Sequence, residues 1–154
     1  MNELKYIPGD LVMTNGVPLG TAKGVVYRVT SSDPSKTLKL DDGTVLKGVV
    51  SLENLEGAKF GDKGYLLGDC GAWIKDIIPI PLVSVILEKN GWKKEKYGLL
   101  YYKKESNTIE LRLIGKTYDW TLRCGNKDLI EKVKFVNQLQ HFLFGLEINH
   151  EIEV

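Results

Sequence analysis

Apolar and polar residues alternate in short stretches along the first half of the chain, and turn residues separate these stretches. Such alternation is typical of strands with one buried face. The clearest stretches lie at 24–30, 37–40 and 44–50. "DPS" at 33–35 indicates a turn between the first two. Asp42-Gly43 predicts a tight hairpin between the last two, because hairpin turns favour residues that accept a positive φ.

The same half also contains "SLENLEG" at 51–57, which predicts a single helical turn with Ser51 as its N-cap. Together with the remaining apolar stretches, the pattern predicts five short strands within residues 1–76. Many short strands separated by glycine-rich turns are typical of small barrels. We therefore expect an SH3-like small antiparallel β-barrel over 1–76.

The second half begins with a different pattern. A short helix is predicted over 81–92, and Asn90 and Gly91 can supply a left-handed cap at its end. Alternating residues then predict three antiparallel strands, with one face exposed to water. These strands are expected at 98–104, 108–114 and 117–124.

A long closing helix is predicted over 126–148, with Asn126 as its N-cap and Gly145 near its end. The resulting order is α-β-β-β-α over 83–154, in which both helices cover one face of a three-stranded sheet. The prolines in 77–82 predict a stiff, extended linker between the two halves. The fold class expected for the whole chain is α+β.

The closing helix carries polar side chains where hydrocarbon is expected. On a helical projection its apolar arc is about 240° wide, which predicts cover on more than one side. Asn137 and Gln140 fall within or at the edge of this arc, and a buried amide without a partner costs about 1–3 kcal/mol. They would bond irregular backbone such as the linker, or they would form an amide pair that sets the register of an interface.

Composition and charge narrow the possible functions. The 154 residues carry a formal net charge of +1, so no global field attracts nucleic acid or an anionic membrane. Cys70 and Cys124 form no metal-binding motif, and we expect two buried thiols, with a single disulfide as the alternative. The chain shows no signal-peptide pattern, and its longest apolar run, at 77–87, is too short to cross a bilayer. We expect a cytoplasmic protein with no metal, cofactor or membrane partner.

Two segments carry a resemblance. "DIIPIPLVSVILEKNGWKK" (76–94) and "VKFVNQLQHFLFGL" (133–146) resemble a group of functionally uncharacterised small proteins of Bacteroidetes genomes, phages and mobile elements. The chain departs from the group at the start of the first helix, which lacks the usual Thr-Pro-Glu, and at Asn137, where a histidine is common. The resemblance implies the two-part architecture and an origin in a phage or mobile element, and it brings no catalytic residues.

Lysines and aromatic residues are interleaved over 89–104. This mixture suits single-stranded nucleic acid, through ring stacking and phosphate contacts, although lysines also protect exposed sheet edges from aggregation. The patch contains no arginine, which is the better bidentate phosphate ligand. The residues of this nucleic-acid alternative are Lys93, Lys94, Lys96, Lys103 and Lys104.

The sequence gives little evidence of a catalytic site. Cys70 lies in "GDCGAW" at 68–73, but the two histidines, His141 and His150, are far away near the C-terminus. No glycine-rich phosphate loop and no carboxylate pair suggests catalysis. We therefore assign no catalytic residue and expect a non-enzymatic protein that binds another protein, with nucleic acid and a homo-oligomer left open as partners. The expected contact residues are Trp92, Tyr101, Tyr102, Trp120, Asn137 and Gln140.

Overall fold

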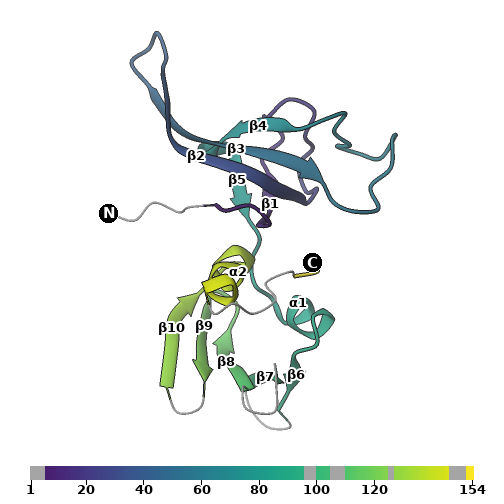
Figure 1. Cartoon of the computed structure of the whole chain (residues 1–154), viewed down its shortest axis with the longest axis vertical. Helices are drawn as coiled ribbons and strands as arrows, with labels where there is room; N and C mark the ends of the chain where they lie inside the picture. Colours follow the sequence, from purple (N-terminus) through teal and green to yellow (C-terminus); the bar gives the residue numbers. More distant parts are fainter. Residues whose placement is uncertain (1–5, 96–99, 105–109, 125–126, 146–151) are drawn as a thin grey trace. The chain divides into compact units, whose positions relative to one another are not determined.

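The chain forms a mostly β structure in two compact units (Figure 1). The computed structural model describes residues 6–95, 100–104, 110–124, 127–145 and 152–154. The first unit is Met1–Ile80 and the second is Pro81–Val154. Each contains a five-stranded antiparallel sheet, and two short α-helices accompany the second sheet in the described part of the chain.

The first sheet has the strand order β4-β3-β2-β1-β5. Its strands are β1 (Leu11–Thr14), β2 (Tyr27–Lys39), β3 (Val45–Asn54), β4 (Cys70–Trp73) and β5 (Ile77–Pro79). The 3₁₀ turn η1 (Ile74–Asp76) joins β4 to β5, although these two strands lie at opposite edges of the sheet. The last strand therefore returns to pair with the first.

This short connection requires the sheet to curl. The edge strands of a flat five-stranded sheet lie about 19 Å apart. Four residue steps span at most about 14 Å when fully extended, and less in a 3₁₀ turn. The curl encloses a core to which all five strands contribute. Among the described residues β4 and β5 form no ladder with each other, so the curled sheet stays open and the closed ladder of a full barrel is not formed.

The predicted hairpin at Asp42-Gly43 is confirmed, with a different turn from the one expected. Gly43 N–H donates to the Leu40 carbonyl at 3.0 Å, and only Gly43 has a positive φ there, of 90°. This geometry is that of a type I turn followed by a left-handed glycine bulge. The turn predicted at 33–35 is wrong, because this segment lies inside β2, where a register shift between Asp33 and Thr37 accommodates Pro34 as a bulge.

Two further expectations for this unit are corrected. The helical turn predicted over 51–57 is not formed over 51–54, because β3 continues to Asn54 and buries Leu52 in the core. The linker predicted over 77–82 is wrong for 77–79, which forms β5 against β1. Pro79 is tolerated there because β5 is an edge strand, whose outer side needs no ladder hydrogen bond.

The second sheet has the strand order β10-β9-β8-β7-β6. Its strands are β6 (Lys93–Lys94), β7 (Leu100–Lys104), β8 (Glu110–Lys116), β9 (Asp119–Cys124) and β10 (Lys127–Val133). The three strands predicted from the sequence correspond to β7, β8 and β9. The first residues predicted for two of them, 98–99 and 108–109, lie outside the described part. The sheet gains β6 and β10 at its edges, so the expected three-stranded sheet is wrong.

Helix α1 (Ser84–Lys89) is shorter than the helix predicted over 81–92, but the predicted left-handed cap at its end is confirmed. Gly91 has a φ of 86°, and its N–H donates to the Glu88 carbonyl. The next N–H, of Trp92, reaches back to the Leu87 carbonyl at 3.0 Å. This pair of bonds is the Schellman motif, which satisfies carbonyls left free at a helix end.

The long helix predicted over 126–148 is wrong in its first part. Helix α2 spans only Val136–Gly145, and residues 127–133 form β10; Asn126 and residues 146–148 lie outside the described part. Ile130 pairs with Leu122, and Val133 pairs with Trp120. Two residues of β10, Glu131 and Lys132, therefore oppose one residue of β9, which is a bulge, and Lys132 adopts a φ of 56° there. The bulge turns Ile130 and Val133 to the same face and so produces a spacing that resembles a helix.

One face of the second sheet is buried and the other is exposed. Leu111, Leu113 and Leu122 are fully buried, whereas Arg112 between the first two is exposed. The buried Trp120 donates from Nε1 to the Leu82 carbonyl at 2.8 Å, which fixes the segment before α1 over this face. Tyr118 in the β8–β9 turn packs edge-on against Phe135, just before α2, with ring centroids 6.1 Å apart.

Gly115→Ala should destabilise the second unit strongly. Gly115 pairs with Trp120 and has a φ of 129°, and a Cβ there would collide with the Asp119 carbonyl oxygen. The matched control is Gly91→Ala, which has a φ of 86° but ample space, with Lys103 Cε at 3.9 Å. We expect a loss of about 1 kcal/mol for the control and at least about 3 kcal/mol for Gly115→Ala.

Urea unfolding followed by tryptophan fluorescence measures this difference. A Trp73→Phe background leaves Trp92 and Trp120, which both lie in the second unit. Equal losses for the two alanine variants would show that the collision is relieved by a shift of the β8–β9 turn.

Candidate functional site

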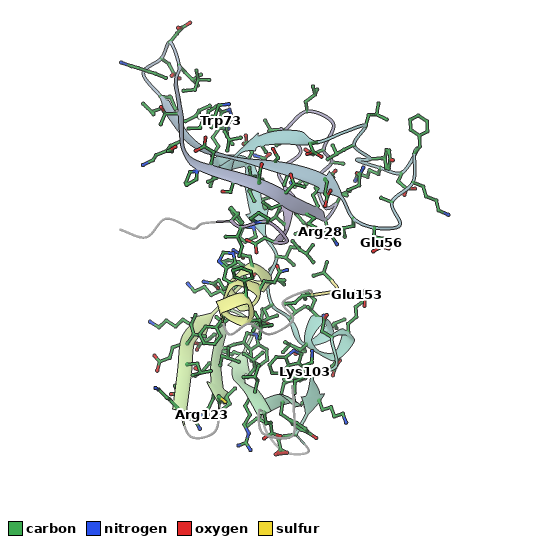
Figure 2. The ribbon with its side chains drawn as sticks, in the orientation of Figure 1. Arg28, Glu56, Trp73, Lys103, Arg123 and Glu153 are labelled. Atoms are coloured by element: carbon green, nitrogen blue, oxygen red, sulfur yellow. The ribbon has the colours of Figure 1, made fainter. Side chains whose placement is uncertain are left out.

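Two long loops of the first unit lie at the same end of its central strands. Residues 15–26 connect β1 to β2, and residues 55–69 connect β3 to β4; Glu56 marks the start of the second loop in Figure 2. Tyr27, at the start of β2, pairs with Asn54, at the end of β3, so the two loops leave the sheet side by side. Their proximity follows directly from the antiparallel order of the strands.

The Tyr27 hydroxyl joins these loops. Tyr27 is fully buried, and its Oη accepts from the Ala22 N–H at 3.0 Å and donates to the Gly64 carbonyl at 2.7 Å. Gly64 has a φ of 72°, and a Cβ there would collide with the Tyr27 hydroxyl and with Ala22. One buried side chain therefore holds both loops by their backbones.

Further contacts fix the second loop against the sheet and against the first loop. Asn54 binds Leu66 at both backbone groups: Nδ2 donates to the Leu66 carbonyl at 2.8 Å, and Oδ1 accepts from the Leu66 N–H at 2.9 Å. The Leu66 side chain lies beneath Gly20 of the first loop. Cys70 Sγ donates to the Leu19 carbonyl at 3.1 Å. The loops are thus fixed before any ligand binds.

Large apolar side chains nevertheless project from these fixed loops into water. Leu19 is 91% exposed, Phe60 82% and Leu67 85%, which makes them the three most exposed large apolar residues in the described part of the chain. Scattered exposed leucines are normal, but a group of them on one surface marks an interaction site. We call the surface formed by Leu19, Phe60, Leu67 and the hollows beside them the loop groove.

The loop groove contains two hollows on either side of segment 65–69. One has a volume of about 580 Å³ and is lined by Leu19, Gly20 and residues 65–71. The other has a volume of about 450 Å³ and is lined by Glu53, Asn54, Phe60 and residues 65–69. Phe60 packs edge-on against Tyr65 at 6.2 Å, which gives the second hollow an aromatic wall. Volumes of this size lie within the range of ligand pockets, so each hollow has room for one or more side chains or for a small ligand.

The contact residues predicted from the sequence do not include Leu19, Phe60 or Leu67. The available signal was the presence of large apolar residues within turn segments, which the formation of a turn does not explain. The loops' proximity depends on the strand pairing, which the local pattern does not show.

Cys70 lies at the edge of the groove as a buried thiol. Burial raises the pKa of the Cys70 thiol, so the nucleophilic thiolate is disfavoured at neutral pH. Cys70 and Cys124 are both free cysteines. Among the residues that the structure describes, no three histidine, cysteine or carboxylate side chains are grouped as metal ligands would be.

Three of the four aromatic residues predicted as contacts are buried within the second unit. Trp92, Tyr101 and Trp120 belong to its core, and Tyr101 and Trp120 pack edge-on at 5.8 Å. Tyr101, predicted as a contact residue, is not available for one, because it faces the same buried side of the sheet as its partner Leu113. Tyr102 is partly exposed on the other side.

The predicted lysine patch is only partly brought together. Lys93 and Lys94 are exposed on the edge strand β6, and Lys103 is partly buried in β7. Lys96 and the Lys104 side chain lie outside the described part. The strand register instead places arginines beside the patch. Tyr102 pairs with Lys93 on one side and Arg112 on the other, and Arg112 pairs with Arg123 on β9. We call Lys93, Tyr102, Arg112 and Arg123 together the cationic row.

The arginines of the cationic row are already paired with carboxylates. Arg112 binds Glu110 at 3.0 Å, and Arg123 binds Asp128 at 2.7 Å. Both pairs are partly exposed, and such pairs each contribute about 1 kcal/mol or less. The row can still bind an anion, but the carboxylates reduce its attraction for one.

Asn137 and Gln140 are both buried, at 0% and 1% exposure, but they differ in their bonding. Among the described residues, neither the Oδ1 nor the Nδ2 atom of Asn137 has a hydrogen-bond partner, whereas Gln140 does take part in an interaction. The partner expected for Asn137 in the segment 77–82 is therefore not found.

Comparisons of the chain with family models, curated proteins and solved structures give no match. None of the described helices is long and apolar enough to cross a membrane. The assignment of function therefore depends on the geometry of the chain itself.

Asn137→Leu should stabilise the second unit, and Gln140→Leu should destabilise it. Leucine at 137 removes a buried amide that has no partner, which we expect to raise the free energy of unfolding by about 1–3 kcal/mol. Gln140 is buried and takes part in an interaction, so leucine at 140 should lower the free energy of unfolding. Urea unfolding in the Trp73→Phe background measures both changes. Destabilisation by Asn137→Leu would show that the Asn137 amide contributes to the fold.

Proposed function

We propose that this chain is a non-enzymatic binding protein and that its loop groove binds an extended segment of a protein partner. The observation that carries the proposal is the exposure of Leu19, Phe60 and Leu67 on loops that Tyr27 and Asn54 hold in place. Exposed apolar side chains on a mobile loop could fold back onto the surface. On a fixed loop they stay available to a partner.

The energetics favour such binding. Burial of one leucine or phenylalanine side chain contributes about 1.5–3 kcal/mol. Because the loops are already ordered, association loses little conformational entropy on this side of the interface. The two hollows have room for separate side chains, and an extended peptide crossing Leu67 can fill both. A compact folded surface would reach them less easily.

We further infer that the first unit is an SH3-like small barrel in an open form. The five antiparallel strands, the return of β5 to β1, and the 3₁₀ turn between β4 and β5 support this classification. Barrels of this size commonly bind ligands with the loops at one end. The position of the loop groove agrees with this arrangement.

A phage-displayed library of linear random peptides, selected against the whole chain, tests the protein-binding proposal. We expect enriched peptides with at least two apolar side chains, whose affinity is then measured by fluorescence anisotropy. Leu19→Asp and Leu67→Asp should each weaken binding by about tenfold or more, because each removes an apolar contact.

Val45→Asp is the matched control, because Val45 is an exposed apolar residue of the same unit that lies on β3 and does not line the groove. Circular dichroism of each variant checks that the unit is folded. Failure to enrich any peptide, or equal losses for Val45→Asp and Leu67→Asp, would contradict the proposal.

The cationic row supports a second candidate, the binding of single-stranded nucleic acid. The register brings Lys93, Arg112 and Arg123 into line with Tyr102, which supplies one ring for stacking. If the row binds nucleic acid, anisotropy with a labelled oligonucleotide should show an affinity that falls steeply with salt and is weakened about tenfold by the double variant Arg112→Glu, Arg123→Glu. The control is Lys36→Glu in β2, an exposed lysine of the first unit. Absence of binding at low salt would exclude this candidate.

A further inference from the structure

The loop groove is acidic as well as apolar. Glu53 and Asp69 line the smaller hollow, and Asp69 also lines the larger one. Neither hollow is lined by a lysine or an arginine. A third hollow of the same unit differs, because Lys63 and Asp62 line it together. The negative charge is therefore a property of the groove and not of every hollow in this unit.

The two carboxylates of the groove are not equivalent. Glu53 pairs with Arg28 across the β2–β3 ladder, at 3.6 Å between Oε1 and Nη1. Asp69 is exposed and forms no ion pair with any described residue. It also differs from Asp62, the other aspartate of these two loops, because Asp62 accepts from the Lys59 N–H and so holds its own turn together. Asp69 has no comparable role in the loop.

The location of Asp69 determines what it can contact. In the chain it lies between Leu67, whose side chain is exposed, and Cys70, at the start of β4. A side chain bound in either hollow therefore lies beside both an apolar surface and an unpaired carboxylate. A lysine or arginine fits this combination, because its methylene stem packs on apolar surface while its charged end reaches a carboxylate.

We propose that the partner segment carries a lysine or arginine close to its apolar side chains, and that the cationic group binds Asp69. This inference rests on the proposed function of the loop groove and adds the charge of the partner. The apolar contacts supply most of the affinity, and Asp69 selects among apolar segments by favouring basic ones and disfavouring acidic ones.

The peptides enriched from the random library test the inference. Basic residues should be over-represented at a fixed distance from an apolar residue, and acidic residues should be depleted. For one enriched peptide, Asp69→Lys should weaken binding by about tenfold, and a higher salt concentration should weaken binding to the unmodified protein by a few-fold. Asp41→Lys is the control with the same charge change, because Asp41 lies at the exposed β2–β3 turn and not in the groove.

A double-mutant cycle separates a direct contact from a general charge effect. Replacement of the basic peptide residue by norleucine should weaken binding to the unmodified protein, and it should have almost no further effect on Asp69→Asn. Peptides that bind in a Leu67-dependent manner but show no basic preference and no coupling to Asp69 would overturn this inference and leave the binding function intact. Enrichment of no peptide would overturn both.

Discussion

The short connection between β4 and β5 is the constraint on which the first unit depends. Three residues join strands at opposite edges of one sheet. The edge strands of a flat sheet are too far apart for so short a connection. Asp76 fixes the connection, because its Oδ1 accepts from Asn15 Nδ2 at 2.8 Å and its carbonyl accepts from the Asn15 N–H at 3.1 Å. The curl that results encloses Tyr27 in the core and places its hydroxyl between the two loops. The arrangement of the groove therefore depends on how the sheet curls.

Local patterns predicted those elements whose formation depends on neighbouring residues. The hairpin at Asp42-Gly43 and the cap at Gly91 each require a glycine with a positive φ, and the sequence shows both directly. The alternation of β8, with Leu111 and Leu113 buried and Arg112 exposed, also survives in the structure. In these elements the periodicity and the turn chemistry agree, and no distant strand changes the outcome.

The remaining elements depend on partners far away in the sequence. The spacing of Ile130 and Val133 is compatible with a helix, and only pairing with Leu122 and Trp120 across a bulge makes it a strand. Pro79 alone suggests a linker, and only the pairing with β1 shows that residues 77–79 form an edge strand. The candidate site shows the same limitation, because the burial of Trp92, Tyr101 and Trp120 and the assembly of the loop groove are both set by strand register. Aromatic residues alone do not show which face of a sheet they will occupy.

The exposed residues of the groove and the buried residues beneath them have opposite physical requirements. Leu66 lies under Gly20 and is held at both backbone groups by Asn54, while its neighbour Leu67 points into water. A chain selected for stability alone would gain from a polar residue at 67, because exposed leucine contributes nothing to the core and favours association. The two hydrogen bonds between Asn54 and Leu66 hold the backbone directly before Leu67, whose side chain is 85% exposed. An exposed leucine on a fixed loop is what the proposed partner segment would bury, and both hollows beside Leu67 have room for side chains of that segment.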